Sequence, residues 1–513
     1  MKDPLKTVIQ SIDALADDNL RNQARQLLTD WLPAATQEGL SELLEGCNQQ
    51  AADTSVPARN QLRFFLGELA NWLRPPTAGR FNSDQLSLLE SLYHCLDNDW
   101  QTSQHVLSLL SLQGDETALE ILVELLVNSP PSESTAVDMV LGPLILAPPE
   151  NTGILFPRLL DGLAHPSIAV AVLDMANYMT RQNLLDSHPA RERVSQLETL
   201  LHGINHHLEQ MPERPAEPEE SLQQLHSTVA NSIAMAVSLC DAMALIASDT
   251  SISVLRLTCQ LPHRRLRTEA AAALAGLGEE EGQEILLGLA SEPIVRLRVI
   301  QYAEELGIED QLDPSLVNMA ARKESELALW LAQPENVGIP PSSMLLLDER
   351  QQYWPGFEQP VDCFLFQFFY QFDTGEYRNT GIAAPATAAV HANLEHLEIE
   401  DIYALFAGAD VEHEEICQWD VAELGERLEA ERKQLAQFIE DNDFSDVQPQ
   451  LLMQFFGDNV LAAEASRGQQ GGLVVADFVD CLWLPEKDPL RPLAPEDALN
   501  IFSGKKLLET FNA

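Results

Sequence analysis

Two stretches of twelve residues that follow one pattern decide the expected fold. Residues 267–278 read RTEAAAALAGLG, and residues 296–307 read RLRVIQYAEELG, at a constant offset of 29 residues. Both stretches begin with an arginine, end on Leu-Gly and follow a proline, Pro262 or Pro293. Apolar residues recur at helical spacing, and the final glycines suit left-handed helix C-caps. Such a helix pair cannot bury its apolar stripe alone, so the repeat predicts helices stacked on their neighbours.

Helical periodicity also covers most of the chain before this repeat. Apolar residues spaced three and four apart predict amphipathic helices, and prolines at 130–131 and 148–149 separate helical pairs between residues 115 and 181. Residues 211–220 read MPERPAEPEE, which predicts an exposed linker. A long helix is expected next, because apolar residues from 222 to 244 stand in near-heptad spacing.

The chain changes character after residue 340, where we expect an aromatic strand. Residues 361–372 read VDCFLFQFFYQF, which places five aromatic side chains on one face of a strand. Residues 373–376 carry turn residues and residues 377–382 form a short return strand, so a β-hairpin is predicted. Exposed, its aromatic face would promote aggregation. The hairpin is therefore expected to dock on helices.

Beyond the hairpin, we predict an acidic helical region. One helix is expected over residues 399–408 and a longer one over residues 417–438. Acidity is concentrated here, because residues 395–446 contain 17 acidic and three basic residues. The predicted organisation is an N-terminal helical region over 1–210, a linker over 211–220, helical repeats over 221–340, a β-hairpin module over 341–390, and an acidic helical C-terminal region over 391–513.

The overall charge excludes two classes of partner. The 513-residue chain has 79 acidic residues against 31 lysines and arginines, a net charge of −48 at pH 7. Such a molecule repels phosphate backbones and anionic lipids, so neither nucleic acid nor a membrane surface is an expected partner. Acidic surface also confers solubility without any specific role. The N-terminus lacks an apolar signal segment, and no run of about 18 uncharged apolar residues occurs, so we expect a cytoplasmic protein.

No catalytic motif is present in the sequence. The patterns GxGxxG, GxxxxGK[ST], GxSxG and HExxH are all absent, which argues against nucleotide hydrolysis and serine-hydrolase chemistry. The seven cysteines lie far apart without a CxxC pair and are expected to be buried thiols. Asp410, His413 and Cys417 would share a helix face and are weak metal candidates, the alternative being a buried thiol near a capping Asp and a surface His. No cofactor is expected.

Basic residues of the repeat form the first candidate binding site. They could hold a carboxylate or phosphate, because guanidinium groups bind such anions through paired hydrogen bonds. The alternative is structural: long stems cover apolar surface, and the charged ends pair with acids of the next repeat, such as Glu269, Glu279 or Glu292. The residues concerned are Arg264, Arg267, Arg296 and Arg298.

An aromatic loop before the predicted hairpin is the second candidate. Residues 353–357 read YWPGF, so Tyr353, Trp354 and Phe357 surround a Pro-Gly turn. Exposed aromatic residues on a turn are efficient anchors for a protein partner. Alternatively, they pin the hairpin to neighbouring helices.

The repeated pattern resembles the HEAT-like repeat family of α-solenoids, whose second helix typically opens with an arginine after a proline-bearing turn and closes on Leu-Gly. The resemblance is clear for two repeats and looser over residues 115–181. It implies a mainly α fold: a HEAT-like helical-hairpin solenoid with a small β-hairpin insertion and an acidic helical C-terminal region. The family includes the di-iron deoxyhypusine hydroxylase, built on several His-Glu dyads. This chain has a single dyad, His413-Glu414, which does not support that activity.

The predicted function is non-catalytic. A solenoid surface and an acidic C-terminal face would form a protein–protein interaction scaffold, for a partner protein with a basic patch. The alternative is a metal- or ligand-binding enzyme or carrier, with its site between the hairpin, the Trp354 loop and the acidic helices. A third hypothesis is a maturation factor with transient clients. The sequence leaves open the partner's identity, the oligomeric state and the solenoid face used.

Overall fold

A computed structural model of the chain contains two compact units, residues 1–286 and 287–513. The structure describes residues 4–13, 16–52, 54–75, 79–96, 99–133, 135–148, 152–210, 219–373, 375–411, 416–419 and 426–512.

The first unit is helical throughout its described residues. Its α-helices are α1 (Pro4–Gln10), α2 (Asp18–Trp31), α3 (Gln37–Gln50), α4 (Val56–Leu73), α5 (Ser83–Cys95), α6 (Trp100–Gln113), α7 (Glu116–Asn128), α8 (Thr135–Leu146), α9 (Pro166–Arg181), α10 (Val194–Gln210), α11 (Glu219–Ile246), α12 (Ile252–Thr258), α13 (Arg264–Gly276) and the first part of α14 (Glu280–Leu289). Short 3-10 helices connect some of them: η1 (Leu32–Ala34), η2 (Thr152–Leu155), η3 (Arg158–Ala164), η4 (Arg191–Arg193) and η5 (Asp249–Ser251).

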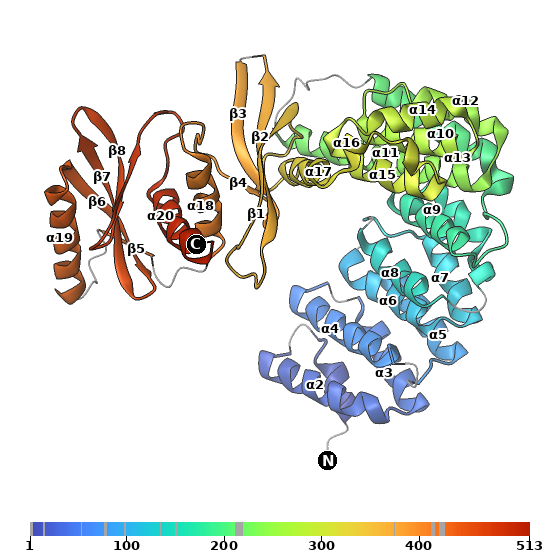
Figure 1. Cartoon of the computed structure of the whole chain (residues 1–513). Coiled ribbons are helices and arrows are strands. Elements are labelled where there is room, and N and C mark those ends of the chain that lie inside the picture. Colours follow the sequence, from blue (N-terminus) through green and yellow to red (C-terminus); the bar gives the residue numbers. More distant parts are fainter. Residues whose placement is uncertain are drawn as a thin grey trace. The chain divides into compact units, whose positions relative to one another are not determined.

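Helices in this unit pack against the second helix along the chain. Helix α3 contacts both α1 and α5, and helix α4 contacts both α2 and α6. The same spacing recurs in the contacts of α11 with α9 and α13. In Figure 1 the colours of these helices change gradually from blue to green, and helices close in sequence lie beside one another. Each amphipathic helix thus buries its leucines between two neighbours, as for the fully buried Leu44, Leu66 and Leu110.

Several expectations for the repeat and the helices before it are confirmed. Gly278 (φ +85°) follows α13, and Gly307 (φ +67°) caps the helix of the second repeat, so both glycines adopt the left-handed conformation. The long helix expected after residue 222 is α11. The segment 227–246 of this helix is long and apolar enough to cross a bilayer. The core helix of a soluble protein can have the same length and composition, and 44% of the most apolar stretch of this segment is buried. Residues 211–218 of the expected linker lie outside the described residues.

The second unit combines helices with two antiparallel sheets. Its helices are α15 (Pro293–Leu306), η6 (Glu309–Gln311), α16 (Pro314–Val317), α17 (Met319–Leu331), α18 (Ile399–Ala409), α19 (Glu426–Asp441) and α20 (Pro495–Phe511). The first sheet has the order β1 (Ser343–Gln352), β2 (Val361–Phe372), β3 (Gly375–Ala383), β4 (Ala388–Ala389). The second has the order β5 (Ile416–Gln418), β6 (Ser445–Phe455), β7 (Asp458–Arg467), β8 (Gln470–Ala476), β9 (Cys481–Pro485).

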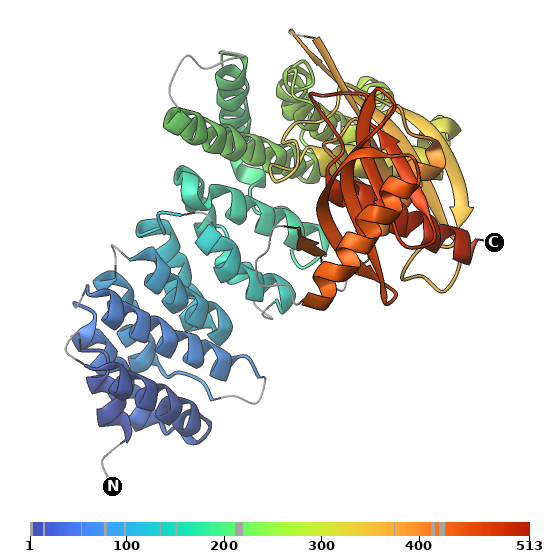
Figure 2. The same ribbon diagram turned by 90° about the vertical axis from the view of Figure 1, so that its left-hand side faces the viewer.

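These elements form five layers in the second unit. Figure 1 shows their order: α17, the first sheet, the pair α18 and α20, the second sheet, and α19. In Figure 2, α19 lies in front of the second sheet. Both faces of each sheet are therefore covered by helices, which accounts for the many apolar side chains on both faces of its central strands.

The aromatic hairpin is confirmed. Strands β2 and β3 are paired along their length, and the last pair before the turn is Phe372 with Gly375. The aromatic face of β2 packs on α17, where Phe366 and Phe368 join Leu327 in one core cluster. The opposite face packs toward α18 and α20 through Cys363, Leu365 and Ile382. The expectation that the hairpin docks on helices is correct, and the helices lie on both of its faces.

The mainly helical class is confirmed, but the all-α description and the helical C-terminal region over 391–513 are wrong. Residues 343–352 add β1 to the hairpin, and five strands lie between residues 416 and 485. The long helix expected from Cys417 begins at Glu426, and Cys417 itself lies in β5. The strands were missed because their amino-acid composition also suits helices. In the alanine-rich β7, Leu461 and Ala463 face α19 while Val460 and Ala462 face the central helices, so no polar alternation marks the strand.

Helices α18 and α20 form the central layer and touch through two glycines. A Cβ atom on Gly504 would lie 2.6 Å from the carbonyl carbon of Ala404. A Cβ atom on Gly408 would lie 2.7 Å from the carbonyl carbon of Asn500. Real Cβ atoms do not approach other atoms this closely, so the two backbones are in direct contact and only glycine fits at both positions.

We expect the substitution Gly504→Ala to destabilise the second unit by about 2–3 kcal/mol, because the two helices must separate to admit a methyl group. Thermal and urea unfolding of the full chain measure the change. The matched control is Gly67→Ala in α4, where a Cβ atom meets nothing within 4 Å. That variant should be neutral or gain up to about 1 kcal/mol. Equal stability of the two variants would contradict the close crossing.

A buried histidine fixes the segment after α9 in the first unit. The backbone N–H of Ala190 donates to Nδ1 of His188 at 3.2 Å, so Nε2 carries the proton and donates to Oδ1 of Asn177 at 2.9 Å. Asn177 in turn donates to the carbonyl of Ser238 on α11 at 3.0 Å. Burial lowers the pKa of His188 to about 4. The neutral ring therefore connects three segments.

The stability of this unit should fall as the pH decreases from 6.5 to 4. The folded pKa of His188 is lower than the ordinary value of 6.5, so the unfolded chain binds more protons across this window. Between pH 7 and pH 5 the wild type should lose about 2 kcal/mol more stability than a His188→Gln variant. Urea unfolding of both chains at the two pH values measures the difference. A constant difference would show that the ring is not held neutral.

Candidate functional site

Two of the four arginines of the repeat, Arg296 and Arg298, lie in the second unit and have partners there. Arg296 is buried, and its guanidinium donates to the carbonyls of Ala290 (2.8 Å) and Ala321 (2.7 Å) and to Glu324 (2.5 Å). It joins α15 to α17, which agrees with the structural alternative except that its acidic partner is Glu324. Arg298 lies over the ring of Tyr302, 4.4 Å from its centroid.

The other two arginines lie on α13, in the first unit. Arg264 is exposed and Arg267 is half-buried, and both have interaction partners. Of the acids named as partners of such arginines, Glu279 pairs instead with Arg256, at 2.5 Å. Of the four arginines, Arg296 has contacts that join two helices.

The structure divides the aromatic loop at 353–357 into one buried and two exposed rings. Trp354 is only 2% exposed, and its indole Nε1 donates to Asp410 at the end of α18 (3.1 Å). The backbone N–H of Tyr353 donates to the side chain of Asn512, which donates back to the carbonyl of Tyr353. Trp354 thus pins the loop to the central helices, whereas Tyr353 and Phe357 are displayed on the surface.

Two of the three metal candidates, Asp410 and Cys417, do not lie on one helix. Helix α18 ends at Ala409, Asp410 follows it, and Cys417 lies in β5, while His413 is outside the described residues. The carboxylate of Asp410 accepts the Trp354 hydrogen bond. Across the described part of the chain, no group of three or more His, Cys, Asp and Glu side chains is placed to hold a metal ion. The expectation that Cys417 lies on a helix with Asp410 is therefore wrong, because Cys417 lies in a strand, and metal binding by these residues stays a prediction.

Exposed apolar side chains gather at one end of the second unit. The antiparallel order of the second sheet places the β6–β7 and β8–β9 turns at the same end. Lys506 of α20 pairs with Asp480 in the β8–β9 turn (3.3 Å), and the C-terminal end of α20 bonds to the β1–β2 loop through Asn512. Figure 1 shows this loop and the C-terminus at the same end of the unit. The aromatic end consists of Tyr353, Phe357, Phe456, Phe478, Val479 and Phe511, all exposed.

Both turns of the aromatic end have fixed conformations. Phe456 (φ +49°) and Gly457 (φ +85°) join paired residues in a two-residue hairpin turn, a position that usually carries Asn or Gly. Phe456 is nevertheless 76% exposed. In the other turn, Asp477 accepts the backbone N–H groups of Val479 (2.8 Å) and Asp480 (2.7 Å). Although burial acts to raise its pKa, these bonds and Lys506 hold the pKa of Asp477 below its ordinary value.

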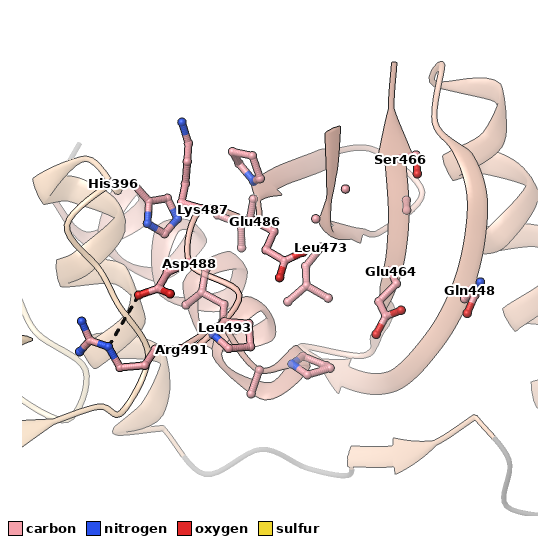
Figure 3. A pocket seen from close by; sticks show the side chains of 18 of the residues that line it. His396, Gln448, Glu464, Ser466, Leu473, Glu486, Lys487, Asp488, Arg491 and Leu493 are labelled. Atoms are coloured by element: carbon pink, nitrogen blue, oxygen red, sulfur yellow. Dashed lines mark ion pairs between the residues drawn. The ribbon is translucent and has the colours of Figure 1, made fainter. Parts of the chain in front are cut away.

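A cleft of about 570 Å³ opens at the opposite end of the second sheet. Figure 3 shows it between the strands that carry Glu464 and Leu473 and the loop that carries Glu486 to Leu493. Burial, followed by the charge of Lys487, lowers the pKa of His396 on its rim, so this ring is neutral at pH 7. The lining carboxylates outnumber the cations: Asp446, Glu464, Glu486 and Asp488 against Lys487 and Arg491.

No known protein family, curated protein or solved structure is detectably similar to this chain. Sequence reasoning found Tyr353 and Phe357 but missed Phe456, Phe478 and Val479. A signal was available at residues 455–458, which read FFGD: an aromatic pair followed by Gly-Asp predicts a hairpin turn with an aromatic tip.

The substitution Trp354→Phe should destabilise the second unit by about 2 kcal/mol, through the lost hydrogen bond to Asp410 and the volume left unfilled. Phe357→Ser in the same loop should change stability by no more than about 0.5 kcal/mol, because that side chain is 47% exposed and lies on the surface. Thermal unfolding of the two variants compares the roles directly. Similar losses in both would contradict the division of the loop into a buried anchor and a displayed surface.

Proposed function

We propose that this protein is a non-catalytic scaffold that binds a partner protein through the aromatic end of its second unit. The observation that carries the proposal is the gathering of six exposed apolar side chains from four separate segments. Exposed apolar groups scattered singly need no explanation, but a clustered set is typical of interaction surfaces. Aromatic rings on rigid turns lose little conformational entropy on binding, so they are efficient anchors.

The charge around the aromatic end defines the partner's chemistry. Glu358, Asp458 and Glu509 lie next to the exposed rings in sequence and are themselves exposed. Lys506, which lies at this end, forms ion pairs with Asp477 and Asp480. A segment that combines apolar and basic side chains, such as one face of a basic amphipathic helix, complements this surface in both respects. An acidic or purely polar segment does not.

The first unit is proposed to be a HEAT-like solenoid, a second surface for holding partners. The contacts of each helix with the second helix along the chain and the repeated twelve-residue pattern support this. A cytoplasmic location stays a prediction. A ligand site between the hairpin, the Trp354 loop and the acidic helices stays a prediction. In that region the indole of Trp354 already donates a hydrogen bond to Asp410.

The proposal predicts selective binding of a basic amphipathic helix. An 18-residue Leu/Lys peptide, labelled for fluorescence anisotropy, should bind the full chain, whereas the matching Leu/Glu peptide should not. The double variant Phe456→Asn and Phe478→Ser should weaken binding at least tenfold, because two central anchors are removed. Asparagine suits the left-handed conformation at position 456, so the turn is preserved. Raising salt to about 0.5 M should weaken binding further.

The matched control is Leu329→Ser, which removes an exposed apolar side chain from α17, away from the aromatic end. This variant should bind as tightly as the wild type. Equal binding of the acidic and basic peptides, or an equal loss in the Leu329 and aromatic-end variants, would refute the proposal.

A further inference from the structure

We propose that the cleft at the opposite end of the second sheet binds an organic cation with an apolar stem, an alkylguanidinium or alkylammonium group, between Glu464 and Glu486. The cleft shares no residue with the aromatic end, so this inference goes beyond the proposed partner surface. It rests on two carboxylates without partners, an apolar floor and the charge of the lining.

The two carboxylates come from different elements and flank the same leucine. Glu464 on β7 stands directly opposite Leu473 on β8, and Leu473 stands opposite Leu484 on β9, so the three side chains form one row on the same face of the sheet. Glu486 follows this row, and its backbone N–H donates to the carbonyl of Gly471 at 3.0 Å. Figure 3 shows Glu464 and Glu486 on either side of Leu473.

Neither carboxylate is used within the protein. In the described part of the chain, the side chains of Glu464 and Glu486 have no hydrogen bond or ion pair. The neighbouring Asp488 differs, because it accepts from the side chain of Asn393 (3.2 Å) and the backbone of Leu490 (3.0 Å). A cation entering the cleft would therefore meet two carboxylates that need not first give up another partner.

The floor of the cleft suits an apolar stem. Leu473 is 8% exposed and Leu484 is 3% exposed, so both belong to the core that underlies the sheet. A Cβ atom on Gly472 would lie 2.8 Å from the Cα of Pro485, so glycine at 472 allows the ends of β8 and β9 to come together beneath the cleft. A volume of about 570 Å³ lies in the range of small-ligand sites.

The available charge of the lining favours a cation over an anion. Arg491 is already engaged: it donates to the carbonyl of Arg378 (2.9 Å), lies over the ring of Tyr377 (4.6 Å) and stands 3.8 Å from Asp488. Lys487 points away from the two glutamates in Figure 3. A metal ion is a poorer fit, because the described residues offer no set of three ligands. A guanidinium or ammonium group needs only the two carboxylates.

The test uses small probes that separate charge from shape. N-acetyl-arginine amide represents a peptide-borne side chain, agmatine a free small molecule, and N-acetyl-citrulline amide the neutral isostere. Ligand-observed NMR on the full chain should show binding of the two cationic probes and not of the citrulline compound. Glu464→Gln and Glu486→Gln should each weaken binding about threefold and together about tenfold, because both carboxylates are exposed and exposed ion pairs are weak. Glu335→Gln, an exposed acid outside the cleft, should have no effect.

Each outcome decides a separate point. Equal binding of citrulline and arginine probes, or unchanged affinity in the Glu464/Glu486 double variant, would overturn the site. Tighter binding of the arginine amide identifies a peptide side chain as the ligand, and tighter binding of agmatine identifies a free amine. The Phe456 and Phe478 double variant should leave probe binding unchanged, so failure of the cleft and failure of the partner surface can be told apart.

Discussion

The second unit depends on the direct backbone contact between α18 and α20. Because Gly408 and Gly504 carry no side chain, the two helices form one thin layer that presents apolar residues to both sheets. The first sheet covers one face of this layer through Leu365 and Ile382, and the second covers the other through Met453 and Val475. A wider separation would open cavities on both sides at once, since interiors of this density do not rearrange cheaply. The two sheets are thus held by the same pair of glycines.

The predictability of each element follows from how its residues are buried. Helices of the first unit bury one stripe, so apolar residues recur every three or four positions and the helical character of this region was predicted correctly. The aromatic hairpin was found because its two faces differ, with rings toward α17 and smaller residues toward α18. Strands β6 to β8 are buried on both faces, and their alternation is lost. The stretch LAAEAS at 461–466 has a composition as suitable for a helix as for a strand, and only its pairing partners decide.

The candidate sites show the same division between local and distant information. The YWPGF loop was recognised from its composition, but only the fold reveals that Trp354 donates a hydrogen bond to Asp410, 56 residues later, and lies in the apolar core. Arg296 belongs to a visible basic cluster, yet carbonyls of Ala290 and Ala321 take up its guanidinium. The aromatic end unites segments from residue 353 to residue 511, a juxtaposition that no local pattern encodes. The sequence therefore showed which types of side chain are present, but not which of them are exposed and without a partner in the fold.

The two proposed surfaces lie at opposite ends of one meander, and α20 runs between them. Its first residue, Pro495, lines the cleft, and its last, Phe511, belongs to the aromatic end, about 25 Å away for a helix of this length. Coupling between the ends would require α20 to slide or turn. The contact of Gly504 with Ala404 opposes both movements, since any rotation brings a larger side chain against α18. Lys505 and Lys506 add ion pairs to Asp401 and Asp477 on either side of the helix. A rigid α20 therefore makes the two surfaces independent, so that occupation of the cleft leaves the aromatic end as it was.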